Sequence, residues 1–155
     1  MFKDAKWIFD SKQYSKNSYG WFFKYVDVSE PIIESIINIS AHNHFKLIIN
    51  GETISGLVTP APSVINKEKL YLSYDLKNHL KLGSNKIEVI VLYLGGGGQN
   101  YLNGTPGFIC QGFVKTKNTC IPIISDENFL NYTKTPLTND MPFQQSRRIT
   151  PVQYY

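Results

Sequence analysis

Apolar and polar residues alternate with a period of two along several short stretches of the chain, as they do in strands that bury one face. The clearest alternation runs over residues 33–41, where Ile37, Ile39 and Ala41 are separated by polar side chains. Residues 85–94 are apolar on both faces, which indicates a strand in the centre of a sheet. Further strands are predicted at residues 5–9, 20–28, 44–49, 70–74, 107–115 and 120–124.

Turn residues separate these stretches. Asn50-Gly51 predicts a tight hairpin, because a type I′ turn needs positive φ at both of its central residues. Residues 75–82, ended by Gly83, and residues 126–132 each predict about one helical turn. About eight short strands with one or two helical turns, and no long amphipathic helix, indicate an all-β protein with an antiparallel β-sandwich fold.

The periodic pattern decays after residue 132, which divides the chain into two parts. Residues 1–132 carry every predicted strand, and a domain of this size can bury a substantial core. Residues 133–155 contain Pro136, Pro142 and Pro151 and show no periodicity. We predict a β-sandwich domain over 1–132, followed over 133–155 by an irregular tail or linker toward a further domain.

The formal net charge of +4 comes from lysines that are scattered along the chain. Arg147 and Arg148 are the only arginines. Because a nucleic-acid-binding surface gathers its basic residues on one face, we expect no nucleic-acid partner. The N-terminus lacks an apolar signal segment, and no stretch approaches the roughly 20 apolar residues of a membrane helix. We therefore expect a soluble, cytoplasmic protein without a membrane partner.

The two cysteines lie on neighbouring strands of one predicted hairpin. In that hairpin Lys115 faces Cys120, so Cys110 faces Ser125 and the two thiols are several residues out of register. This offset exceeds the Cα separation of about 7 Å that a disulfide tolerates. We expect two free, partly buried thiols, which fits a reducing compartment.

Four motifs follow one another along nearly the whole chain. They are Ala5-Lys6-Trp7-Ile8, the hairpin at 37–51 that closes on Ile-Asn-Gly, the segment 74–87 that opens on Tyr-Asp-Leu and contains Leu-Gly-Ser-Asn, and Ser-Asp-Glu-Asn-Phe at 125–129. In this order they resemble the N-terminal β-sandwich of the α-L-rhamnosidases, family 78 of the glycoside hydrolases. Phe45 and Phe129 stand where that family usually has Tyr and Trp. Four glycines at 95–98 stand where it often has Gly-Asn-Gly-Trp-Tyr.

The resemblance implies a jelly-roll of galactose-binding-like fold with no catalytic residues of its own. In the family the catalytic carboxylates belong to a later (α/α)-barrel domain, so that domain of the parent chain is the expected partner. The sequence agrees, because glycoside hydrolysis needs two carboxyl groups flanking the scissile bond. The acidic residues here mostly lie at turns, and Asp75 and Asp126 are better explained as caps of the turns that follow them.

Other kinds of chemistry have weak signals. His42 and His44 would share a face of a continuous strand, but no third metal ligand is evident and a solvent-facing pair is the preferred interpretation. His79 is isolated. The glycines at 95–98 lack the Lys-Ser/Thr end of a phosphate loop and precede no helix. We expect no metal and no cofactor.

One candidate ligand site remains. Gln99, Asn100 and Tyr101 follow the glycine run, and amides with an aromatic ring suit sugar hydroxyls and a pyranose face. The alternative, an ordinary surface loop, is preferred. Trp21 is a further candidate for stacking on a sugar, with core packing as its alternative, and Trp7 is assigned to the core or to a domain interface.

The leading hypothesis is a non-catalytic accessory domain of an α-L-rhamnosidase-like glycoside hydrolase, which packs on the catalytic domain and helps to shape its active-site mouth. A rhamnose-containing carbohydrate is the expected ligand, if there is one. The alternatives are a stand-alone carbohydrate-binding module and a structural or interaction domain without a ligand.

Overall fold

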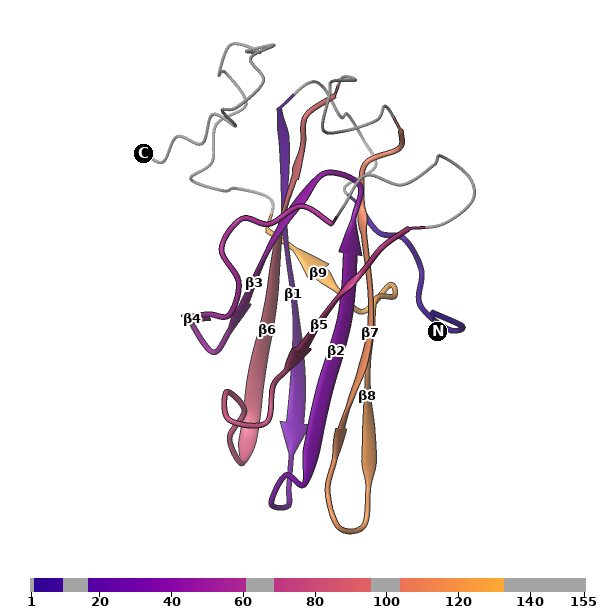
Figure 1. Ribbon diagram of the computed structural model, residues 1–155. Helices are drawn as coiled ribbons and strands as arrows, with labels where there is room; N and C mark the ends of the chain where they lie inside the picture. The colour runs from indigo at the N-terminus through magenta and orange to yellow at the C-terminus, as the bar shows by residue number, and fades with distance from the viewer. Residues whose placement is uncertain (1, 10–16, 61–68, 96–103, 133–155) are drawn as a thin grey trace.

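The computed structural model describes residues 2–9, 17–60, 69–95 and 104–132, which form two antiparallel sheets packed face to face (Figure 1). The five-stranded sheet has the order β4-β3-β6-β1-β9, and the four-stranded sheet has the order β5-β2-β7-β8. The strands are β1 (Ser18–Val28), β2 (Glu34–Ala41), β3 (His44–Ile49), β4 (Glu52–Thr53), β5 (Leu72–Asp75), β6 (Gly83–Tyr93), β7 (Phe108–Lys115), β8 (Cys120–Ile124) and β9 (Leu130–Asn131). The predicted all-β sandwich is confirmed, and the described residues include no helix.

Strand β6 is the centre of its sheet, as its apolar pattern predicts. It pairs with β1 over the whole length from Ser18↔Tyr93 to Val28↔Gly83, and with β3 on its other side. Ile87 and Val89 are completely buried between the sheets. A strand flanked on both sides and apolar on both faces can only lie inside a sheet, because an edge would expose those side chains.

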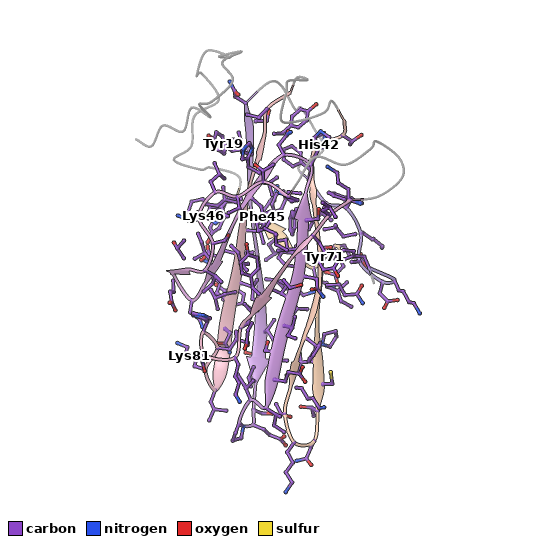
Figure 2. The ribbon with its side chains drawn as sticks, in the orientation of Figure 1. Tyr19, His42, Phe45, Lys46, Tyr71 and Lys81 are labelled. Carbon is purple, nitrogen blue, oxygen red and sulfur yellow. The ribbon has the colours of Figure 1, made fainter. Side chains whose placement is uncertain are left out.

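The core fills the space between the two sheets with alternate side chains from each strand. Phe45 of β3 is completely buried there, whereas the neighbouring Lys46 lies on the far side of the sheet (Figure 2). Phe22 of β1 and Phe108 of β7 have ring centroids 5.2 Å apart and so join the two sheets. Phe129 packs edge-on against Phe108 at 5.6 Å. Aromatic pairs of this geometry contribute beyond their buried area.

The Asn50-Gly51 turn has the backbone conformation that its sequence predicts. Asn50 has φ 52° and Gly51 has φ 85°, both in the left-handed region that a type I′ turn requires. The Asn50 side chain also reaches across to the start of β6, where its Nδ2 donates to Oδ1 of Asn85 at 2.9 Å. The turn that pairs β3 with β4 is thereby tied to the turn that begins β6.

Asn85 is completely buried and is the centre of a hydrogen-bond network at this end of the sandwich. Its Oδ1 accepts from the Lys81 backbone N–H at 2.8 Å, and its Nδ2 donates to the carbonyls of Lys81 at 2.7 Å and Gly83 at 3.0 Å. One side chain therefore closes the loop between β5 and β6. Asparagine suits this position because its amide both donates and accepts.

Three segments differ from the expectations. Residues 5–9 form one isolated bridge, Ile8↔Phe108, in place of a strand, and Trp7 is 46% exposed. At Leu76 a single turn closes through the N–H groups of His79 and Leu80 and does not continue. In 126–132 a turn capped by Asp126 leads into the short strand β9, because Leu130 and Asn131 find partners on β1. Period and propensity do not reveal such non-local pairing.

The hairpin of β7 and β8 has the predicted register, with Lys115 opposite Cys120. The Ser125 backbone N–H donates to the Cys110 carbonyl, and the Cys110 N–H donates to the Ser125 hydroxyl. Both cysteines are free. Their burial is unequal. Burial raises the pKa of the Cys110 thiol to about 12, whereas Cys120 is exposed. The cytoplasmic location stays a prediction.

The domain boundary also stays a prediction, because residues 133–155 lie outside the described part of the chain. Within the described ranges, no helix is long and apolar enough to cross a membrane.

Candidate functional site

The predicted loop set, Gln99, Asn100 and Tyr101, lies outside the described residues, so its role in sugar binding stays a prediction. Trp21 is described and lies on β1. Its side chain is half-buried on the outer face of the five-stranded sheet, because side chains alternate along a strand and the neighbouring Phe22 points into the core. Trp21 does not join the two sheets as a core residue.

Aromatic side chains cover this outer face at the β1 end. Tyr132 follows β9 and folds back over β1, where its ring centroid lies 5.0 Å from that of Trp21 and 4.7 Å from that of Phe23. The backbone N–H of Tyr132 donates to the Trp21 carbonyl at 2.9 Å. Tyr25 continues the row, stands edge-on to Phe23 at 5.9 Å and is 57% exposed. We call Trp21, Phe23, Tyr25 and Tyr132 the aromatic face.

A charged pair lies beside the aromatic face. The Lys86 Nζ is 5.1 Å from the ring centroids of both Phe23 and Tyr132, and it forms an ion pair with Glu88 at 3.1 Å. A hydrogen bond to the Tyr132 hydroxyl is the main reason that the pKa of Lys86 is raised. The protonated ammonium group of Lys86 attracts the rings of both Phe23 and Tyr132 through cation–π interactions.

Two buried polar atoms on the strands of this sheet have no hydrogen-bond partner among the described residues: Nε1 of Trp21 on β1, and Nδ1 of His44 on β3. The sequence predicted a solvent-facing histidine at position 44, and this prediction is wrong for its buried Nδ1 atom. Burial lowers the pKa of His44. His42 follows the end of β2, so the two histidines do not lie on one continuous strand. The described residues contain no cluster of three metal-ligating side chains.

Three carboxylates in the described residues have a lowered pKa, whereas the acid of a glycosidase needs a raised one. Hydrogen bonds from Asn118 and Thr116 lower the pKa of Glu30, and the pKa of Glu127 is lowered by a backbone hydrogen bond and by Lys6. Burial raises the pKa of Asp126, but hydrogen bonds from Lys24 and Asn128 outweigh this effect and leave it below its ordinary value. Within these ranges the carboxylates with shifted pKa values are structural.

Asp126 makes a testable contribution to stability at neutral pH. Its carboxylate accepts a hydrogen bond from Lys24 at 3.0 Å, and both side chains are mostly buried. Because the folded-state pKa lies below the unfolded value of about 3.9, the contribution is present above that value and is lost as the pH falls further. We expect Asp126→Asn to lower the unfolding free energy at pH 7, with a difference from wild type that shrinks below about pH 4.

Urea denaturation of both proteins between acidic and neutral pH measures this difference. Glu127→Gln is the matched control, because its ion pair with Lys6 at 3.1 Å is exposed on both sides and such pairs contribute little. A difference for Asp126→Asn that is independent of pH would contradict the assignment.

A groove on the opposite sheet was not anticipated. It has a volume of about 390 Å³, lies along β2 and β5, and is lined by Ile33, Glu34, Ile36, Ser73, Tyr74, Asp75 and Lys77. Alternation along β2 predicts that Glu34 and Ile36 share a face, but the sequence does not show that β5 is the neighbour of β2. The pairing of Ile36 with Asp75 places the lining residues of β2 next to those of β5.

No protein-family model matches the sequence, and no curated protein sequence does. Solved structures match the fold. A family 78 rhamnosidase of Bacillus sp. GL1 superimposes with a TM-score of 0.73 and 24% identity over 88% of this chain. The α-L-rhamnosidase of Dictyoglumus thermophilum gives 0.69 and 26% over 87%. The chain has the fold of one α-L-rhamnosidase domain. This rhamnosidase-like domain covers only 14% of the Bacillus protein and 17% of the Dictyoglumus protein, a small part of their length.

A lectin from Pleurotus ostreatus, solved in complex with GalNAc, also matches the rhamnosidase-like domain, with a TM-score of 0.61 and 14% identity. The match covers 92% of this chain and 41% of the lectin chain. At this identity the likeness concerns the sandwich fold alone.

Proposed function

We propose that the chain is a non-catalytic accessory domain, N-terminal in an α-L-rhamnosidase-like glycoside hydrolase, that packs on the catalytic domain of the parent chain and helps to shape its active-site mouth. The supporting observation is the match to only 13–17% of each of four rhamnosidases. The described carboxylates support the same proposal, because none of those with a shifted pKa has it raised.

The aromatic face is the surface proposed for this packing. On a solvated sheet face the outward side chains are ordinarily polar, yet here Ile90 and Leu92 of β6 point outward and are buried beneath their neighbours. Tyr25 is the most exposed residue of the aromatic face, and its ring is available for contact with another domain. A catalytic domain that offers apolar side chains would complete this face.

The reading frame beyond Tyr155 provides the first test. We expect it to continue into a catalytic domain, and a frame that stops there overturns the accessory role. In the full-length protein, Tyr25→Glu should lower the melting temperature and expose the domain junction to protease, because it places a charge in an apolar contact. The same change in the 155-residue chain should have little effect. Lys117→Glu, on the exposed turn between β7 and β8, is the control.

A carbohydrate is the second partner that we propose. The lectin that shares this sandwich was solved with GalNAc, and the rhamnosidases act on rhamnosides by their name. A groove of about 390 Å³ has the volume of a small-molecule site, for which about 300–1,000 Å³ is usual. The ligand favoured by the rhamnosidase likeness contains rhamnose.

A further inference from the structure

The groove on the outer face of the four-stranded sheet is built by the register between β2 and β5. Ile36 pairs with Asp75 and Asn38 with Ser73. The backbone hydrogen bond from Leu76 to the Ser35 carbonyl, at 2.9 Å, continues this pairing past the end of β5. Lys77 therefore comes level with Glu34, two residues along the same face as Asp75 and Ile36.

The polar groups along this face differ in whether they have partners. The Ser73 hydroxyl donates to the Asn38 side chain, and Oδ1 of Asp75 accepts the Lys77 backbone N–H at 2.9 Å. In the described ranges, by contrast, the side chains of Glu34 and Lys77 form neither an ion pair nor a hydrogen bond. A carboxylate and an ammonium group thus lie next to each other along the groove without pairing with each other.

We propose that this groove binds a single pyranose unit, with Glu34 accepting hydrogen bonds from sugar hydroxyls, Lys77 donating to a sugar oxygen, and the lining side chains of Ile33 and Ile36 contacting the C–H face of the ring. Each sugar hydroxyl both donates and accepts, so neighbouring sugar hydroxyls suit a site that offers an acceptor and a donor side by side. The apolar floor suits the C–H face, which carries no polar group. This inference rests on the proposed carbohydrate ligand and does not depend on the accessory role.

The groove is a different place from the loop of Gln99, Asn100 and Tyr101, and it lies on the opposite sheet from the aromatic face. An open groove binds a monosaccharide weakly, because each hydrogen bond from a sugar hydroxyl to the protein replaces one to water and the net gain in free energy is small. We therefore expect dissociation constants in the millimolar range for methyl α-L-rhamnoside.

Titration of the 155-residue chain with methyl α-L-rhamnoside and with N-acetylgalactosamine, followed by amide NMR shifts, tests the proposal. Saturable shifts should gather on β2 and β5 around Ile36 and Asp75. Glu34→Gln and Lys77→Met should each weaken binding about tenfold, because each removes a charged hydrogen-bond partner. Glu127→Gln and Lys117→Met make the same charge changes at exposed positions outside the groove, and they should leave the affinity unchanged.

Three results overturn the site. One is the lack of saturable binding of either sugar at millimolar concentration. Another is an equal loss of affinity in the Glu127 and Lys117 controls. The third is binding that Tyr101→Ala abolishes and Glu34→Gln leaves intact, which assigns the sugar to the loop instead. None of these results bears on the reading frame or the Tyr25 experiment, so failure of the groove is distinguishable from failure of the accessory role.

Discussion

Replacing Asn85 with alanine is expected to lower the unfolding free energy by about 3 kcal/mol, because it removes a buried side chain that bonds to several backbone groups at once. Asn85 accepts from Lys81 and Asn50 and donates to the carbonyls of Lys81 and Gly83. The loop between β5 and β6 would lose its connection to the Asn50-Gly51 turn. At this size, 3 kcal/mol corresponds to a fall in melting temperature of about 6–12 °C.

Asn85→Asp separates the effect of lost hydrogen bonds from that of lost volume. Aspartate keeps the acceptor but replaces the donor with an oxygen that faces carbonyls, so it should be at least as destabilising as alanine at pH 7. Thermal denaturation followed by circular dichroism measures both variants. Asn118→Ala is the control, since its hydrogen bond to Glu30 is exposed and its loss should cost about 0.5 kcal/mol or less. Equal effects at Asn85 and Asn118 would show that the network does not stabilise the fold.

Gly112→Ala is the second large effect, with an expected loss of about 3 kcal/mol or more in unfolding free energy. Gly112 lies on β7 opposite Ile37 of β2. A Cβ atom added there would lie 2.2 Å from the Ile36 carbonyl oxygen and 2.8 Å from the Ile37 Cα. Both neighbours are backbone atoms of a paired strand, so relief requires the two strands to move apart and weakens their hydrogen bonds.

Urea denaturation of Gly112→Ala against wild type measures this loss as a lower midpoint. Gly56→Ala is the matched control, because no atom lies within 4 Å of the Cβ it would add. That substitution should leave stability unchanged or raise it by about 0.4–1 kcal/mol, since alanine restricts the unfolded chain. An unchanged midpoint for Gly112→Ala would mean that the sheet accommodates the methyl group without strain.

Some features of the candidate sites are predictable from the sequence, and others are not. The caps at Asp75 and Asp126 were predictable, because each carboxylate binds a backbone N–H two residues along the chain. The burial of His44 was not, because it depends on the opposing Leu92 and on what covers that face. The sequence does not reveal that Glu34 and Lys77 lie together in the groove, because 43 positions separate them in sequence.

Sequence alone determined the features that depend on neighbouring residues. The alternation along β2, the two-faced apolar pattern of β6 and the positive φ of Asn50 and Gly51 all follow from local side-chain period and backbone sterics. The tertiary structure alone decided which strands became neighbours. Pairing with β1 turned the expected helical segment at 126–132 partly into β9, and pairing of β5 with β2 formed the groove. A strand's period specifies which face is buried, but the partner across the sheet is chosen by long-range packing.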